Sequence, residues 1–103
     1  MTSTKNPRPI VQLIDILGTK WVLRILWELN KGPCSFRELQ RRCGGLSPTM
    51  INTRIKDLCA AHLMIKSEDY GYMLTAHGNE LIELFYPLNE FSERWSSQMT
   101  PSN

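Results

Sequence analysis

The first third of the chain carries two short apolar stretches separated by a glycine. Apolar side chains crowd residues 9–17, and Gly18 interrupts them. They resume over residues 21–29 with the spacing of a helix that buries one side. Gly18 predicts the end of a first helix, and Thr19 is the expected N-cap of a second. We therefore predict two helices before the Gly32-Pro33 break.

Two further helices are predicted on either side of a double glycine. Ser35 is a good N-cap for a helix over residues 36–43, with a glutamate three residues later as in a capping box. Gly44-Gly45 then forces a sharp turn, and a serine and a proline at 47–48 start the next helix. The inner face of this fourth helix is expected to hold Ile51, Ile55, Leu58 and His62.

The pattern then changes to that of a β-hairpin followed by one long helix. Residues 63–68 and 72–75 are predicted to be strands around a tight turn at 69–71. A final helix is predicted over residues 76–98, capped by Thr75 and kinked by Pro87. Its apolar stripe consists of Leu81, Leu84, Phe85, Leu88, Phe91 and Trp95.

The order of these elements predicts a winged helix-turn-helix fold. The chain is expected to be mostly α-helical with a small two-stranded β-hairpin, and two short helices joined by a glycine turn precede that hairpin. Residues 9–98 are expected to form one domain, between a flexible arm at 1–8 and a flexible tail at 99–103.

The second helix of such a pair enters the major groove of DNA with its N-terminal part leading. Asparagine can pair with adenine, threonine can bond a base edge or touch a thymine methyl group, and lysine can meet a phosphate. The cap at Ser47 and Pro48 leaves backbone N–H groups that can bind a phosphate. A helical wheel puts four polar residues opposite the apolar face, namely Thr49, Asn52, Thr53 and Lys56.

Charge is distributed unevenly, although the net charge is only +2. Residues 31–66 carry seven basic and two acidic side chains, a net +5, whereas residues 67–103 carry one basic and six acidic ones, a net −5. The central segment could face a polyanion, but ordinary solvated surface charge explains the composition equally well. Arg54, at the edge of the wheel, either pairs with Glu38 or Asp57 or reaches a phosphate. Further candidate phosphate contacts are Arg37, Arg41 and Arg42.

The chain offers no arrangement of residues that is typical of an enzyme. Its three cysteines have no CxxC spacing, and the two histidines lie at the wrong intervals for zinc, so no metal is expected. No catalytic triad order or phosphate loop is found, and no cofactor is predicted. We expect buried free thiols at Cys34, Cys43 and Cys59, with a redox switch as the alternative.

Cytoplasmic location is the expectation from the N-terminus and the hydropathy. Residues 1–9 are polar and lack the apolar core of a secretory signal. No apolar run approaches the about 20 residues that a membrane span needs.

Four short motifs follow one another at characteristic intervals. They are DILGTKW at 15–21, FREL at 36–39, LSP at 46–48 with RIKDL at 54–58, and LTAHG at 74–78. Each motif alone would be weak, but their order and spacing together are specific. From about Leu13 to Trp95 the sequence resembles the HxlR-type branch of the MarR-like winged-helix regulators.

That resemblance implies a dimeric bacterial transcription factor with double-stranded DNA and a second copy of the chain as its partners. In the family, the first and last helices build the dimer interface. The corresponding residues of this chain are Ile10, Leu13, Ile14, Leu81, Phe85, Leu88, Phe91 and Trp95.

The chain departs from the family pattern in three places. Many redox-sensing members carry a cysteine just before the first helix, whereas residues 6–9 contain none, which counts against that chemistry. The wing is short, and Ser67-Glu68-Asp69 is not basic, which argues against an arginine contact in the minor groove. His62 occupies the usual position of a helix-ending glycine, so the end of the recognition helix is expected to differ.

Two other functions fit the same fold. One is a winged helix that binds protein rather than DNA, since the last third is acidic and the wing is short. The other is a regulator triggered by a thiol reaction or by a small-molecule effector bound near Trp21, Trp27 and Phe85.

Overall fold

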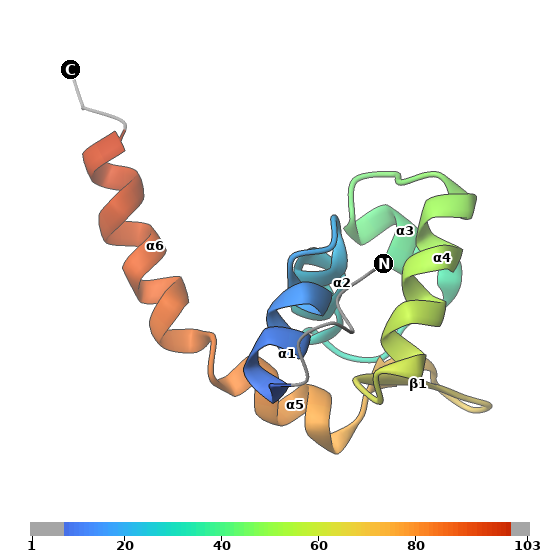
Figure 1. The fold of residues 1–103 in the computed structure, drawn as a ribbon. Helices are drawn as coiled ribbons and strands as arrows, with labels where there is room; N and C mark the ends of the chain where they lie inside the picture. The colour runs from blue at the N-terminus through green and yellow to red at the C-terminus, as the bar shows by residue number, and fades with distance from the viewer. Residues whose placement is uncertain (1–7, 100–103) are drawn as a thin grey trace.

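The computed structural model describes residues 8–99, and the predicted arm and tail lie outside them apart from Arg8 and Met99. Along the chain, four helices are followed by a two-stranded hairpin and then by two more helices (Figure 1). This confirms the predicted mostly α fold with a small hairpin. In chain order the elements are α1 (Pro9–Leu17), α2 (Val22–Leu29), α3 (Phe36–Arg42), α4 (Pro48–Ala60), β1 (Met64–Ser67), β2 (Gly71–Leu74), α5 (Ala76–Glu83) and α6 (Tyr86–Met99).

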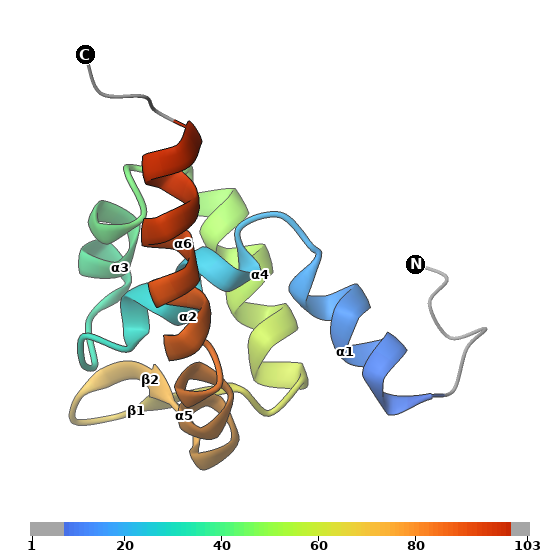
Figure 2. The same cartoon turned by 90° about the vertical axis from the view of Figure 1, so that its left-hand side faces the viewer.

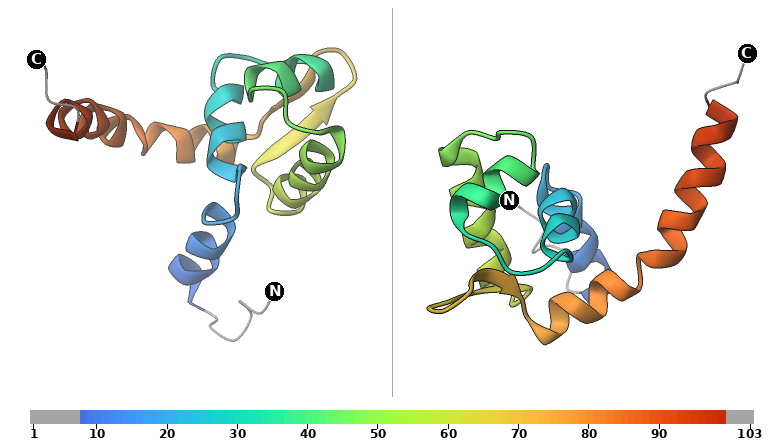
Figure 3. Two further views of the ribbon diagram at one scale, coloured as in Figure 1. Left: turned by 90° about the horizontal axis from the view of Figure 1, so that it is seen from above. Right: turned by 180° about the vertical axis from the view of Figure 1, so that it is seen from behind.

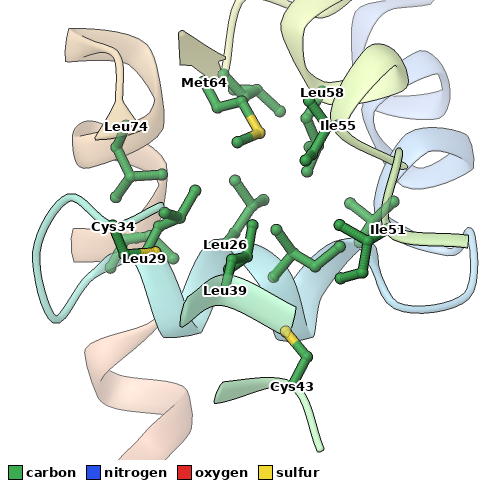
Figure 4. Packing of buried hydrophobic residues seen from close by; sticks show 14 of the residues in the cluster. Leu26, Leu29, Cys34, Leu39, Cys43, Ile51, Ile55, Leu58, Met64 and Leu74 are labelled. Atoms are coloured by element: carbon green, nitrogen blue, oxygen red, sulfur yellow. The ribbon is translucent and has the colours of Figure 1, made fainter. Parts of the chain in front are cut away.

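The hydrophobic core lies around α2, which is enclosed by the helix-turn-helix, the hairpin and α5. Leu26 on α2 points toward Leu39 on α3 and toward the inner face of α4 (Figure 4). On α4, Ile51, Ile55 and Leu58 are buried as predicted, because they lie on one side of the helix. Met64 and Leu74 from the two strands close the core from the other side.

The hairpin is joined to a residue far upstream in the chain. Its strands pair in register from Met64 opposite Leu74 to Ser67 opposite Gly71. Cys34 adds an isolated bridge, in which its N–H donates to Tyr72 O at 3.0 Å and its carbonyl accepts from Tyr72 N at 2.8 Å. A Cβ on Gly71 would lie 2.5 Å from the Cys34 carbonyl oxygen, so this close approach requires glycine. The bridge fixes the wing to the start of α3, and sequence reasoning missed it.

The connection between α1 and α2 differs from the prediction. The Thr19 hydroxyl donates to the Asp15 carbonyl oxygen at 3.1 Å and does not cap α2. Trp21 is the N-cap of α2 instead, with a left-handed backbone at φ 76° and no side-chain cap bond. A bulky residue with positive φ is strained, and the surrounding packing holds it there.

The end of α4 also differs from the prediction. His62 has φ 61°, the left-handed conformation that usually belongs to glycine. Its N–H donates to Cys59 O and the next N–H, of Leu63, donates to Leu58 O, both at 3.0 Å. These two bonds form a Schellman motif, so the helix ends in the usual way with a histidine. The His62 side chain is exposed, and its expected place on the inner face is wrong.

The long final helix of the prediction is two helices. Pro87 cannot donate an N–H, and its ring clashes with the carbonyl four residues earlier, at Glu83, where α5 ends. Pro87 is then tolerated in the first turn of α6. Proline was predicted to kink the helix, but it coincides with a full break at residues 84–85.

Two helices project from the winged body. Seen from above, α1 and α6 leave it in different directions (Figure 3). Figure 2 shows the hairpin at the base of the body beside α5, with α6 rising past α2. Among residues 8–99 we find no helix with the length and hydropathy that a membrane crossing requires.

Candidate nucleic-acid interface

The turn between α3 and α4 is held by backbone and side-chain bonds. Gly44 and Gly45 both have positive φ, at 84° and 82°, which explains the glycine pair. The Gln40 amide on α3 donates to the Leu46 carbonyl at 2.6 Å across this turn. These contacts fix the angle at which α4 leaves the turn.

The N-terminus of α4 is capped as the sequence predicted. The Ser47 hydroxyl accepts from Met50 N at 3.2 Å, and Pro48 occupies the first helical position. The two residues at the tip of the helix are exposed. Ser35 caps α3 in the same manner, accepting from Glu38 N at 3.1 Å. The Glu38 carboxylate pairs with Arg41 and Arg42, so the predicted capping box is only half formed.

The outward face of α4 carries the polar residues that the helical wheel predicted. Four side chains are exposed opposite the buried face, namely Thr49, Asn52, Thr53 and Lys56. The Thr53 hydroxyl donates to the Thr49 carbonyl at 2.9 Å, which leaves its oxygen free to accept. The face therefore offers an amide, two hydroxyl groups and one cation on a continuous helical surface.

Arg54 belongs to the interior side of this helix. Only 17% of its side chain is exposed. Its Nε donates to the Lys20 carbonyl at 2.8 Å, and its Nη1 donates to Asp57 Oδ2 at 3.2 Å. Of the alternatives left open for Arg54, the structure has the pair with Asp57.

The arginines of α3 differ in their availability. Arg37 is exposed. Arg41 is exposed too, but its Nε donates to Glu38 Oε1 at 3.0 Å. Arg42 is only 18% exposed, and its Nη1 donates to the Glu28 and Gly32 carbonyls at 3.2 and 3.1 Å. The expectation of a three-arginine phosphate clamp needs correction at Arg42, because its guanidinium already ties α3 to the end of α2.

A buried carboxylate organises the charges behind α3. Glu28 is 6% exposed and pairs with Arg24 and Lys31, each at 2.9 Å. Burial raises the pKa of this carboxyl, but hydrogen bonds and charge from Lys31 and Arg24 outweigh burial and hold it below its ordinary value. Hydrogen bonds from Arg41 and Arg42 likewise lower the pKa of Glu38. Sequence reasoning missed Glu28, whose only signal was a charge among the apolar residues of α2.

The wing offers little positive charge. Lys66 lies 5.6 Å from the centre of the Tyr72 ring, and Tyr70 is exposed at the tip. Glu68 and Asp69, beside it, are exposed as well. The tip of the wing is therefore acidic, and residues 63–75 contain no arginine.

The residues expected at a dimer interface fall into two groups. On α1 and α6 the large apolar side chains are exposed, Ile14 at 58% and Trp95 at 52%. Ile10, Leu88 and Phe91 are exposed to a similar extent, whereas Leu13 and Phe85 are half-buried. Leu81 is only 8% exposed, because it packs in the core of its own chain, and it needs removal from the interface set.

An apolar cavity of about 300 Å³ opens between α2, α5 and α6. Of the three residues named for a possible effector, Trp27 and Phe85 line this cavity and Trp21 does not. Tyr86, which is not part of the lining, accepts a hydrogen bond from Asn30 at 2.8 Å, and the centre of its ring lies 5.9 Å from that of Trp27.

The three cysteines are free thiols. Cys34 and Cys43 are buried and Cys59 is half-buried. Burial raises the pKa of all three thiols, which keeps them protonated and weakly nucleophilic. Within residues 8–99 no three His, Cys, Asp or Glu side chains gather in a way that could hold a metal ion.

Comparison with known proteins gives a consistent result. The profile of the HxlR-like helix-turn-helix family matches residues 16–100, most of the chain. An uncharacterized HTH-type transcriptional regulator of Synechocystis sp. is 28% identical over 97 residues, 87% of this chain and 71% of that protein.

Solved structures agree with the sequence comparisons. A possible HxlR family transcriptional factor from Thermoplasma volcanium is 26% identical, with a TM-score of 0.75 over 86% of this chain and 85% of that one. The quinone-bound YodB of B. subtilis shares the fold, with a TM-score of 0.75 at 24% identity over 84% of this chain and 98% of that one. Such regulators are not enzymes. The chain belongs to the HxlR-like helix-turn-helix family and is a DNA-binding transcriptional regulator.

Proposed function

We propose that α4 lies in the major groove and that Asn52 is its principal base-reading residue. The observation that carries the proposal is the exposed polar face of α4 opposite three buried apolar residues. An amide can pair with adenine through two hydrogen bonds, whereas Thr49 and Thr53 offer hydroxyls and methyl groups to base edges. Lys56, one turn further along, contacts a phosphate.

The backbone contacts come from the ends of the two helices. The capped N-terminus of α4 presents the positive end of the helix dipole, which favours a phosphate, although Pro48 has no N–H and the N–H groups of Met50 and Ile51 already bond Ser47. Arg37 supplies an exposed cation on α3. Arg41 contributes only when it leaves Glu38, and Arg42 and Arg54 act within the protein rather than on DNA.

The regulator acts as a homodimer through α1 and α6. Each of these helices exposes large apolar side chains that the single chain does not cover, including Ile10 and Ile14 on α1 and Leu88, Phe91 and Trp95 on α6. An exposed apolar surface of this kind on projecting helices favours association. A second copy presents the same surface, and a two-fold dimer brings two α4 helices to two half-sites.

The proposed role as a regulator of transcription indicates a cellular location and a candidate effector site. A regulator of transcription in a bacterial cell works on DNA in the cytoplasm, where thiols stay reduced. The cavity beside Trp27 and Phe85 is the candidate effector site, because a ligand there would touch both the winged body and α6.

The experiment that tests base reading compares variants on specific and scrambled duplexes. Fluorescence anisotropy with DNA from upstream of the gene should show binding that prefers this duplex and weakens steeply with salt. Asn52→Ala should relax preference at one base position by about 1–3 kcal/mol, whereas Arg37→Ala should weaken all duplexes alike. Asn79→Ala, an exposed asparagine on α5, is the matched control and should change neither quantity.

Two outcomes would contradict the proposal. Equal behaviour of Asn52→Ala and Arg37→Ala would refute the assignment of base and backbone roles. If the wild-type protein bound no duplex even at low salt, the protein-interaction alternative would replace it. For the dimer, light scattering should give twice the chain mass of 11.9 kDa, and Trp95→Glu should reduce it to one chain.

A further inference from the structure

The side chain of Arg54 joins the recognition helix to the segment that leaves α1. Its Nε donates to the Lys20 carbonyl, three residues after the end of α1, at 2.8 Å. Within residues 8–99 this is the one hydrogen bond that connects α4 directly to the α1–α2 connection. The same guanidinium holds Asp57 on its own helix. The planar guanidinium of Arg54 thus bridges α4 and the α1–α2 connection.

The segment that receives this bond is short and has a strained backbone at Trp21. Between the end of α1 and the start of α2 there are four residues, and Val22 N donates to Thr19 O at 3.1 Å across them. Trp21 stands at φ 76°, and the Lys20 ammonium lies 5.6 Å from the centre of its ring. Strain of this kind persists only where surrounding contacts over-determine the backbone. A movement of α1 is therefore passed to the carbonyl that Arg54 holds.

We propose that Arg54 is a positioning residue, which fixes the orientation of α4 relative to α1 and so sets the separation of the two α4 helices in a dimer on DNA. The inference rests on the proposed dimeric DNA binding through α1 and α6. In this proposal Arg54 determines which spacing between half-sites the dimer prefers, and it does not contact the DNA of either half-site. The choice of arginine follows, because a lysine ammonium cannot present two donors in a fixed plane.

The test measures selectivity for half-site spacing. Footprinting on the upstream duplex defines the half-sites, and a second duplex carries one extra base pair between them. The ratio of the two dissociation constants reports how firmly the α4 helices are held apart. Unfolding of part of a sample leaves this ratio unchanged, because it lowers binding to both duplexes equally. Spacing selectivity therefore separates positioning from loss of stability.

Arg54→Lys is the decisive variant, because it keeps the charge and removes the fork. We expect its spacing ratio to fall about tenfold, the effect of losing one charge-assisted hydrogen bond. The control Lys56→Gln removes an exposed charge from the same helix and should weaken both duplexes with the ratio unchanged. A wild-type ratio in Arg54→Lys would overturn the inference, whereas wild-type protein that binds no duplex would overturn the proposed function instead.

Asp57→Asn decides the matter if Arg54→Lys does not fold. Asp57 is half exposed, and its loss leaves the fork without its charged partner. The spacing ratio should then fall about twofold to fivefold, as expected for a partly exposed ion pair. If Arg54 instead contacted a phosphate, Asp57→Asn would tighten binding to both duplexes and leave the ratio unchanged. That result would refute the positioning role.

Discussion

Replacing His62 with glycine should stabilise the protein. The residue ends α4 with φ 61°, and its backbone forms the two bonds of a Schellman motif with Cys59 and Leu58. A left-handed backbone costs an ordinary L-residue about 1–2 kcal/mol, because Cβ approaches the following carbonyl oxygen. Glycine avoids that cost. The imidazole is exposed, so its removal costs little packing.

The net magnitude is smaller than the strain relieved. Glycine gives back roughly 0.5–1 kcal/mol, because it loses more conformational freedom on folding. The expected gain in the free energy of unfolding is therefore about 0.5–1 kcal/mol. For a domain of this size that gain raises Tm by roughly 2–8 °C. Thermal melts followed by circular dichroism measure it, at one fixed protein concentration because association alters Tm.

The matched control is His62→Ala. Alanine also lacks the imidazole but keeps a Cβ, so this variant should be no more stable than wild type. If His62→Gly and His62→Ala melted together, the left-handed backbone would not be the source of the strain. If His62→Gly melted below wild type, the exposed imidazole would carry a stabilising role that its surroundings do not reveal.

Three further predictions concern the core and its charges. Gly78→Ala should destabilise by about 1–3 kcal/mol in urea titrations, because a Cβ there would overlap the Leu63 carbonyl oxygen. Because the pKa of Glu28 is lower in the folded protein than its ordinary value of 4.5, its carboxylate stabilises the fold above about pH 4.5. This stabilisation is lost as the pH falls through the folded-state pKa. Acid titration of unfolding should show a shallower loss below about pH 4.5 in Glu28→Gln. Cys34 and Cys43 should react with iodoacetamide far more slowly in the native protein than in urea, because burial raises both thiol pKa values.

The local signals in the sequence predicted three of the helix starts, although they failed at Thr19 before α2. Ser35, Ser47 and Thr75 each cap the helix that follows, as expected, because a cap bond joins residues three positions apart. The Gly44-Gly45 turn and the polar face of α4 were predicted for the same reason. These features depend on neighbours along the chain, so the sequence alone can show them.

Positive φ at Trp21 and His62 could not be predicted in this way. Both residues are rarer in the left-handed region than glycine, although histidine is tolerated there better than tryptophan, so local preference did not point to it. Packing of α2 and α4 on the core over-determines the chain at both points and overrides that preference. For His62 the family pattern did identify the residue, because a helix-ending glycine usually stands there. We expected the helix to end differently, whereas His62 adopts the left-handed conformation of that glycine.

The roles of the buried charges were equally hidden. Arg42 was expected on DNA, and for Arg54 a phosphate was one of two alternatives, but both side chains donate to carbonyl oxygens, those of Glu28, Gly32 and Lys20. A carbonyl leaves no signal in the sequence, and these partners lie 10 to 34 residues away. The one available signal was the position of Arg54 at the edge of the apolar face, where a side chain tends to lie half inside.

The internal pairing of charges changes the expected salt dependence of DNA binding. Among the seven cations of residues 31–66, ion pairs within the described structure involve Lys31, Arg41, Arg42 and Arg54. Three cations then remain for each protomer, Arg37, Lys56 and Lys66, about six in a dimer. Each phosphate contact contributes about −0.9 to the slope of log K against log salt. The expected slope is roughly −5, whereas all seven cations from both protomers would give roughly −13. Anisotropy titrations between low and physiological salt measure this slope. A value near −13 would show that the ion pairs open on DNA and would refute the internal roles assigned to Arg42 and Arg54.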